Sequence, residues 1–351
     1  MSSAMSLFLD LKGKIIQKVI DGTYKVGEVL PTEHELAGEH QLSRVTVRKA
    51  LEELKSEGLL AGVPRQGTMV LERMGGYRSS LDIIALVATV QETFFATFME
   101  HFERTAEDNG SLMLFKQDFQ GKAFYSEAFF FRLVQKNIRN VVLWPQTVQI
   151  DFELLRRLHS VGMNFVFFDQ MFDTDVADTV CLDNDKAVTA LFDYLVEESG
   201  SDSNLLFIGF EGLSLPSAVQ REEAFIQASR RTDAIRNIPW GLPIDQQVAL
   251  LLDCIEKETV RPAGFLCNSG GIGLEMARQL RLRNLEGSLL LGTIDYLPEM
   301  DAYPMAAYRQ PFELMAEKTY QRLIAQNNQG QSWRAGAYQV EGQLIKCGAK
   351  T

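Results

Sequence analysis

Two arginines at helical spacing give this chain its first chemical signal. Arg44 and Arg48 lie in the stretch 43–54, whose apolar residues recur at helical intervals. Residues four apart share one face of a helix, so both guanidinium groups would project together beside the apolar face. Guanidinium groups bind phosphate oxygens and guanine edges through paired N–H donors. The spacing therefore predicts a helix that contacts nucleic acid; a merely solvated face is the ordinary alternative for helical arginines.

The flanking residues predict two short helices followed by a β-hairpin. Thr32 and the glutamate three residues later have the spacing of a capping box at the start of the first helix, and Ser43 is a suitable N-cap for the second. Gly58 would end the second helix, since glycine adopts the left-handed conformation at little cost. Residues 59–61 and 68–70 can then pair as strands. This order predicts a winged helix-turn-helix.

The DNA-facing positions of such a motif are the start of each helix and the turn of the hairpin. Side chains at these places can contact base edges or phosphate oxygens. We expect DNA contacts from Thr32, His34, Ser43, Arg44, Thr46, Arg48, Arg65, Gln66 and Gly67. The partner predicted by this motif is double-stranded operator DNA.

The stretch 22–70 resembles the DNA-binding domain of the gluconate-repressor (GntR) family. The matching residues are Gly22, Gly27, Leu30-Pro31, Glu33, Glu35-Leu36-Ala37, Ser43-Arg44, Thr46-Val47-Arg48, Ala50-Leu51, Leu54, Glu57-Gly58-Leu59 and Gly67-Thr68. One departure concerns DNA contact, because His34 stands where the family often has an arginine that touches DNA. The resemblance implies a transcriptional regulator, with repression favoured over activation.

The overall composition limits the other function classes. The 351 residues carry a net charge of −11 and a pI near 5.0, so basic residues must act locally on nucleic acid. No apolar run approaches the ~18–20 residues that span a bilayer, and the first residues lack a signal-peptide pattern. We therefore expect a cytoplasmic protein without a membrane partner. The dispersed cysteines predict buried free thiols, and the dispersed histidines form no metal-ligand cluster, so we expect no metal and no cofactor.

From residue 81 onward, apolar strands alternate with helical segments. Strands are expected over 83–87, 112–115, 141–144, 165–168, 179–182, 205–208, 264–267 and 289–292. Strands that are apolar on both faces and alternate with helices imply parallel, doubly wound sheets. The remaining length exceeds a typical single sheet, which favours two lobes.

We therefore expect an α/β protein built from a small head and a larger two-lobed domain. The winged helix-turn-helix would occupy residues 1–72, including an amphipathic helix over 7–19 behind the DNA-contacting pair, and a polar linker would occupy 73–80. The two-lobed domain would occupy 81–351. Its first lobe would comprise about 81–183 and 311–351, and its second lobe about 184–310.

The region after residue 81 resembles the sugar-binding core of lactose-repressor-type regulators, which is similar to periplasmic binding proteins. The motifs that carry the resemblance are Phe94-Phe95-Ala96, Asp169, Val180-Cys181-Leu182-Asp183-Asn184, Arg221 with Ala224-Phe225, Asn268, Gly292-Thr293-Ile294-Asp295 and Gln310-Pro311. Together with the N-terminal motif, they make the chain similar to the arabinose-repressor-type subfamily. The resemblance implies a small sugar or sugar derivative bound between the lobes.

The chemistry of these positions suits a polyol. Asp169, Asn268 and Asp295 directly follow strands, where ligands bind in open α/β sheets. Sugar hydroxyls need acceptors and paired donors, and the apolar face of a sugar stacks on an aromatic ring. We expect effector contacts from Phe94, Phe95, Asp169, Arg221, Asn268, Asp295 and Gln310. The competing interpretations are a turn-forming Asp169, a core Phe94 and a surface Arg221.

A glycine-rich helix start keeps a second ligand class open. Asn268 is followed by Ser269, where the lactose-repressor type usually has aspartate, and then by the glycines of 270–273. Free N–H groups there could bind a phosphate or carboxylate, and the glycines weakly resemble a dinucleotide fingerprint. An α/β enzyme or nucleotide-binding protein with a DNA-binding head is the alternative function. The sequence has no nucleophile elbow, P-loop or Ser/His/Asp arrangement, so we do not expect an enzyme.

The expected mode of DNA binding also predicts an oligomeric state. One head contacts only a few base pairs, whereas a two-fold dimer doubles the contacts and matches an inverted repeat. We expect a homodimer whose interface uses the helices that follow the strands at 83–87 and 112–115.

Overall fold

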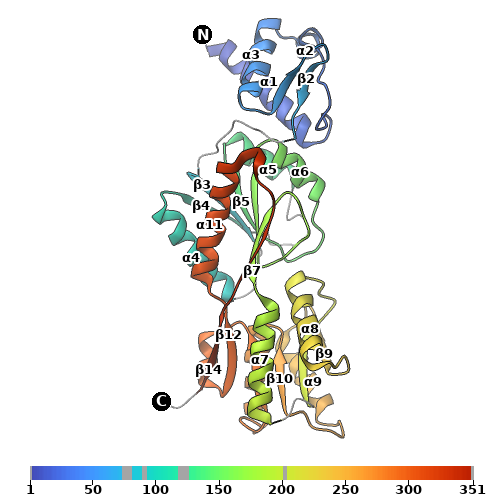
Figure 1. The fold of residues 1–351 in the computed structure, drawn as a ribbon, viewed down its shortest axis with the longest axis vertical. Helices are drawn as coiled ribbons and strands as arrows, with labels where there is room; N and C mark the ends of the chain where they lie inside the picture. The colour runs from blue at the N-terminus through green and yellow to red at the C-terminus, as the bar shows by residue number, and fades with distance from the viewer. Residues whose placement is uncertain (1, 73–80, 89–92, 118–125, 201–203, 349–351) are drawn as a thin grey trace.

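The computed structural model describes residues 2–72, 81–88, 93–117, 126–200 and 204–348. Figure 1 shows three parts along the long axis: an N-terminal head at one end, a first α/β lobe in the middle and a second at the other end. The proposed linker over 73–80 lies outside the described residues. Among those that are described, no helix combines the length and apolar character needed to cross a membrane.

The head is a three-helix unit with a two-stranded wing. Its elements are α1 (Ser2–Ile20), α2 (Glu33–His40), α3 (Arg44–Ser56), β1 (Leu60–Val63) and β2 (Gly67–Val70). Thr32 forms the predicted capping box, and Ser43 caps α3 by accepting a hydrogen bond from the Thr46 amide. The strands β1 and β2 pair antiparallel, each starting or ending slightly beyond its predicted bounds. The predicted winged helix-turn-helix is therefore confirmed.

The first lobe is a parallel six-stranded sheet of order β13-β7-β6-β5-β3-β4. Its strands are β3 (Ile83–Ala88), β4 (Leu112–Gln117), β5 (Asn140–Trp144), β6 (Asn164–Phe168), β7 (Asp178–Leu182) and β13 (Ala337–Val340). Its helices are α4 (Thr93–Asp108), α5 (Glu127–Gln135), α6 (Phe152–Ser160) and α11 (Phe312–Gln329), with the 3-10 turn η2 (Gly330–Ser332). The rings of α4 pack against one face of the sheet together with α11, and α5 and α6 pack against the other.

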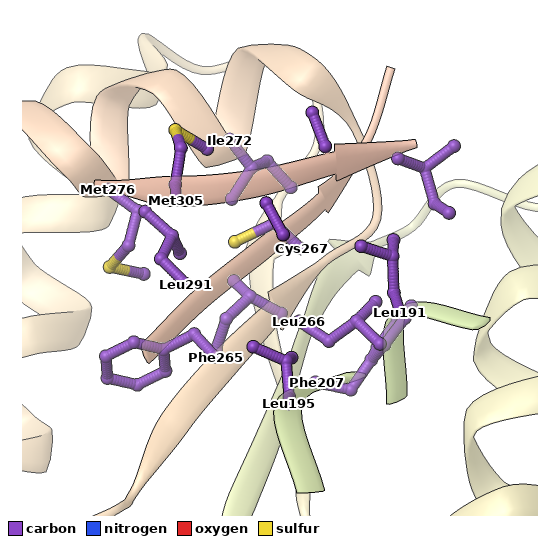
Figure 2. Close-up of a cluster of buried hydrophobic side chains, with 14 of the residues drawn as sticks. Leu191, Leu195, Phe207, Phe265, Leu266, Cys267, Ile272, Met276, Leu291 and Met305 are labelled. Carbon is purple, nitrogen blue, oxygen red and sulfur yellow. The ribbon is translucent and has the colours of Figure 1, made fainter. Parts of the chain in front are cut away.

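The second lobe is a six-stranded sheet of order β14-β12-β11-β10-β8-β9. Its strands are β8 (Leu205–Glu211), β9 (Ile235–Pro239), β10 (Gly264–Cys267), β11 (Leu290–Ile294), β12 (Met305–Arg309) and β14 (Gln343–Cys347). Its helices are α7 (Asn184–Ser199), α8 (Pro216–Ser229), α9 (Ile244–Ile255) and α10 (Gly270–Leu282), with the 3-10 turn η1 (Pro298–Ala302). Figure 2 shows the side chains of α7 and α10 meeting those of the central strands in one apolar core.

The structure corrects two details of the sequence analysis. Residues 311–351 were assigned to the first lobe, but β14 pairs antiparallel with β12 in the second sheet. The chain therefore crosses between the lobes three times, after β7, after β12 and after β13 (Figure 1). The four cysteines are free thiols, yet Cys254 is exposed rather than buried. All eight predicted strands are present, whereas β9, β12, β13 and β14 were not predicted.

The head rests on the first lobe through the end of α1. The Arg157 side chain of α6 donates a hydrogen bond from Nε to the backbone oxygen of Ile20, at 2.6 Å. Ile20 is the last residue of α1, where helix carbonyl groups lack an intrahelical donor. A guanidinium group also suits the negative end of a helix dipole. Apolar residues of α1 and α5 continue the same hydrophobic core across this contact.

Candidate functional sites

The start of α3 is rigid and its polar side chains face outward. The Ser43 hydroxyl accepts the Thr46 amide at 3.1 Å and lies 2.8 Å from the Thr46 hydroxyl. Arg44 is exposed and follows the cap directly. Because the buried face of α3 packs on α1, the opposite face remains available to a partner. This is the geometry with which a recognition helix enters a major groove.

Arg48 is held by a carboxylate from the neighbouring helix. Its Nη2 and Nε atoms donate to the two carboxylate oxygens of Glu33, with a shortest distance of 2.9 Å. The hydrogen bond from Arg48 is the main reason why the pKa of Glu33 lies below its ordinary value. The arginine side chain is 55% exposed, so the pair is open to water and to an incoming anion.

The wing presents its turn to solvent. Arg65 has a φ of 68° and Gly67 a φ of 123°, both in the left-handed region. Arg65, Gln66 and Gly67 are all exposed. At the start of α2, Thr32 and His34 are exposed as well. All nine residues predicted to contact DNA are thus exposed or partly exposed; their contacts with DNA stay predictions.

One exposed residue of α3 was missed by the sequence analysis. Val45 follows Arg44 and has 76% of its side chain in contact with solvent. Val45 lies off the apolar face, between Arg44 and Thr46, which are both predicted to contact DNA. This position was the signal that could have identified it. An apolar side chain at this place has the chemistry to contact a thymine methyl group.

The second site lies where the two lobes meet, and two aspartates mark it. Asp169 follows β6 of the first sheet, and Asp295 follows β11 of the second. Both have left-handed backbone conformations, with φ of 67° and 70°, and both donate their amide to the adjacent strand. Left-handed conformations are unfavourable for residues with a side chain and cluster at functional sites. Each lobe therefore places a buried carboxylate at the carboxyl end of a sheet.

Arg221 connects the polar residues of the second lobe. Its Nη1 atom lies 3.6 Å from an Asp295 oxygen and 2.8 Å from the backbone oxygen of Asn268. Its Nε atom donates to the Asn184 side chain at 2.8 Å. Arg221 is 5% exposed, so the surface interpretation is wrong. Asn268 is oriented by donating its side-chain amide to the backbone oxygen of Ala218.

Gln310 completes the cluster and leaves one acceptor unused. Its Nε2 atom donates to an Asp295 carboxylate oxygen, which fixes the side chain. Its Oε1 atom is buried and has no hydrogen-bond partner among the described residues. An unpaired buried acceptor costs free energy that a ligand hydroxyl would recover. The structure therefore brings together Asp169, Arg221, Asn268, Asp295 and Gln310 as a buried donor and acceptor set.

The electrostatics of Asp169 differ from those of a surface carboxylate. Burial raises the pKa of Asp169 above its ordinary value, the positive charge of Arg221 lowers it, and the negative charge of Asp295 raises it further. The Trp144 side chain and the Gln170 amide, which donates to Asp169, act in the lowering direction, and burial prevails. The protonated carboxyl group is thereby favoured more than in water. A group that can both donate and accept suits a hydroxyl-rich ligand.

Sequence analysis missed four residues of this cluster: Trp144, Gln170, Asn184 and Ser217. Trp144 ends β5, next to the strand that precedes Asp169, and this strand-end position was a usable signal. Gln170, Asn184 and Ser217 have their contacts across elements that are far apart in sequence. No local pattern indicates such contacts.

The two aromatic residues predicted to contact the effector, Phe94 and Phe95, both belong to α4. The side chain of Phe94 lies outside the described residues, although its backbone belongs to α4. Phe95 is 2% exposed, with ring centroids 5.1 Å from Trp144 and 5.6 Å from Phe115. Phe95 is therefore a residue of the first-lobe core, behind Trp144, because the period of α4 turns it toward the sheet. Its predicted contact with the effector stays a prediction.

The glycines at the start of α10 have a packing role. A Cβ at Gly273 would lie 2.5 Å from Thr293, and a Cβ at Gly270 would lie 2.9 Å from the backbone of Asp295. Both residues are required to let α10 approach β11 closely. The Ser269 side chain makes no capping hydrogen bond. The glycine pattern that left a phosphate or dinucleotide open is thus explained by helix–sheet packing.

Comparison with known proteins identifies the head. Residues 8–70 match the family model described as bacterial regulatory proteins, gntR family. The arabinose metabolism transcriptional repressor of Geobacillus stearothermophilus is 36% identical over 108 residues, which cover 30% of this chain and 30% of that protein. The chain thus spans less than a third of the length of this curated relative. The N-terminal unit is a DNA-binding domain of the gntR type.

Comparison with solved structures identifies the fold of the two lobes. The transcriptional regulator CelR in complex with cellobiose superposes with a TM-score of 0.63 at 17% identity, covering 87% of this chain and 90% of that one. A periplasmic binding protein/LacI transcriptional regulator from Alkaliphilus metalliredigens, complexed with D-xylulofuranose, gives 0.59 at 15% identity, with coverages of 76% and 98%. At such identities the likeness shows the fold, which confirms the predicted periplasmic-binding-protein-like architecture.

Proposed function

We propose that this protein is a transcriptional repressor whose affinity for operator DNA is controlled by a small sugar bound between its lobes. The unpaired acceptor of Gln310, buried beside Asp295 and Arg221, is the observation that carries the effector half of the proposal. The gntR-type head supports the DNA half. Such a protein acts in the cytoplasm, where its operator is accessible.

The proposed effector is uncharged. The cluster contains one cation, Arg221, and two carboxylates, Asp169 and Asp295, all buried. The Nε and Nη1 atoms of Arg221 are already directed at Asn184, Asn268 and Asp295. A phosphate or carboxylate on the ligand would therefore add negative charge without a free cation to balance it. Neutral hydroxyl groups can exchange hydrogen bonds with the cluster without this cost.

The proposal includes a homodimer formed through the first lobe. The strand β4 lies at the edge of the first sheet, and its Leu112 and Leu114 side chains are 65% and 40% exposed. Exposed apolar residues on an edge strand favour pairing with another chain. Light scattering at micromolar concentration should give the mass of a dimer. A Leu112→Lys variant should shift the mass toward the monomer, and a monomeric parent protein on DNA would contradict the dimer.

A thermal-shift screen with the full chain tests the effector proposal. Neutral sugars, the corresponding sugar acids and sugar phosphates are compared at equal concentration, because a ligand stabilises the state that binds it. We expect stabilisation by a neutral sugar and recovery of that sugar unchanged after incubation. Turnover of the ligand would favour the alternative of an enzyme with a DNA-binding head. Stabilisation only by the acids or phosphates would contradict the uncharged effector.

A further inference from the structure

The start of α8 lacks a capping side chain of its own. Leu215 occupies the N-cap position and offers no side-chain acceptor, and Pro216 follows it. The Ser217 amide is the first N–H of the helix, and it needs a partner because the first turn has no intrahelical acceptor. A side-chain oxygen of the N-cap residue usually supplies one. Here that acceptor comes from another part of the molecule.

Gln170 of the first lobe supplies the missing cap. Its Oε1 atom accepts a hydrogen bond from the Ser217 amide at 3.2 Å, and its Nε2 atom donates to the Ser217 hydroxyl at 2.9 Å. Gln170 follows β6 in the first sheet, whereas α8 covers the second. Both residues are buried, with exposures of 1% and 6%. The cap therefore exists only while the lobes are together.

The side-chain amide of Gln170 also contacts the effector cluster. Gln170 Nε2 lies 2.7 Å from an Asp169 carboxylate oxygen and donates to it. Arg221 lies one helical turn further along α8 than Ser217. The position of α8 thus determines where Arg221 stands, and the Gln170 contact fixes α8 relative to Asp169. The Gln170 side chain thus links closure of the lobes to the relative positions of Asp169 and Arg221.

We propose that Gln170 is an interlobe latch, a positioning residue that caps α8 from the opposite lobe and favours the closed arrangement. Removing a helix cap changes a folding equilibrium by about twofold to thirtyfold, and the closing equilibrium should change within that range. A ligand that binds only the closed arrangement is weakened by up to the same factor. This second effect rests on the proposed sugar effector, whereas the cap itself does not.

Hydrogen exchange of the full chain without ligand tests the cap directly. Mass spectrometry would follow a peptide that begins ahead of Leu213 and includes Ser217, since the first two residues of a peptide lose their label. In Gln170→Ala we expect faster exchange at the start of α8, with unchanged exchange in α9 and α10. Gln149→Ala, an exposed glutamine of the same lobe, is the matched control and should match the parent.

A second variant separates the cap from the hydroxyl contact. Ser217→Ala removes the Oγ atom and keeps the backbone amide that Gln170 accepts, so protection at the start of α8 should be retained. Unchanged exchange in Gln170→Ala would overturn the latch. Faster exchange throughout the second lobe in that variant would also overturn it, because it would indicate general loss of stability.

Effector titration then tests the consequence for binding. With a neutral sugar that stabilises the parent, Gln170→Ala should raise the dissociation constant by at least twofold, and Gln149→Ala should leave it unchanged. Equal affinities in Gln170→Ala and parent would overturn the link to binding while the proposed function stands. If no sugar binds the parent, the proposed function fails, and the exchange result still decides whether the cap exists.

Discussion

Two arginines in this molecule each meet a carboxylate, under opposite conditions. Arg48 pairs with Glu33 on the head, where the two side chains are 55% and 31% exposed. Arg221 lies near Asp295 between the lobes, where the exposures are 6% and 3%. An exposed pair contributes about 0–1 kcal/mol, whereas losing one partner of a buried pair costs about 3–5 kcal/mol.

The difference indicates how each site exchanges partners. At the surface, water screens the charges, so Arg48 can leave Glu33 for a DNA phosphate at little cost. Between the lobes the Nε and Nη1 atoms of Arg221 already donate to Asn184 and Asn268, and a ligand must offer equivalent hydrogen bonds to replace those contacts. The head is therefore suited to a large polyanion, and the interlobe cluster to a small neutral molecule with hydroxyl groups.

The largest expected effect follows from removing Arg221. Arg221→Ala leaves Asp295 and Asp169 buried without a cation, which should lower the stability of the second lobe by about 3–5 kcal/mol. The effector response should be lost, and ligand-free operator binding should persist. Arg236→Ala is the control, because Arg236 pairs with Glu258 on the surface of the same lobe. Denaturant unfolding and operator titration with and without sugar measure both effects.

A conservative variant keeps this prediction testable if the alanine variant does not fold. Arg221→Lys retains the positive charge and loses the paired geometry toward Asn184 and Asn268. We expect a folded protein with much weaker sugar binding. A normal effector response in Arg221→Lys and in Asp295→Asn would place the effector site elsewhere.

A smaller effect is expected at the recognition helix. Arg44→Ala should weaken binding to a selected operator by about 1–3 kcal/mol if Arg44 contacts a guanine. Stability and sugar binding should be unchanged, because Arg44 is exposed and lies on the head. Fluorescence anisotropy with labelled operator measures the loss, with the surface variant Arg231→Ala as control. Parent-like binding by both Arg44→Ala and Arg48→Ala would contradict the recognition-helix assignment.

The two regions also differ in how far sequence alone could predict them. The head depends on local signals: the Thr32 capping box, the Ser43 cap and the glycine that ends α3 all act within a few residues. The interlobe cluster depends on topology. Asp169 and Asp295 were predictable because parallel strands end at a common edge.

The parts that sequence analysis missed have physical reasons. Gln170 meets Ser217 only because two lobes close on each other, and that contact leaves no periodic pattern. The segment of β14 was assigned to the wrong lobe because a short edge strand of mixed polar and apolar residues can complete either sheet. The place of Phe95 in the core was not predicted, because a pair of neighbouring aromatics does not show which ring faces the core.

The two sites should respond to pH with opposite signs. Glu33 has a lowered pKa, so its contribution to stability is complete above the ordinary glutamate pKa and is lost as the pH falls through its folded-state pKa. Asp169 has a raised pKa, so its protonated form favours folding below the ordinary aspartate pKa, and stability is lost as the pH rises through the raised value. Raising the pH is therefore expected to stabilise the head through Glu33 and to destabilise the interlobe region through Asp169.

Thermal unfolding between pH 4 and 8 would test this contrast. Asp169→Asn should raise the unfolding temperature at neutral pH and flatten its fall with rising pH. Glu33→Gln should lower the unfolding temperature of the head at neutral pH by a small amount, because the pair is exposed. Asp173→Asn, an exposed carboxylate of the first lobe, serves as control. Destabilisation by Asp169→Asn at neutral pH would show that the ionised form is the favoured one.

The smallest effect concerns a single methyl group on DNA. Val45 is 76% exposed beside Arg44, and we expect it to contact a thymine methyl in the operator. Replacing that thymine by uracil should weaken binding of the parent by about 0.8 kcal/mol, the transfer free energy of one buried CH₂ group. Val45→Ala should bind both operators alike, since the partner of the methyl is then absent. Equal sensitivity to uracil in parent and variant would assign the methyl contact to another residue, whereas no sensitivity in the parent would leave Val45 outside the major groove.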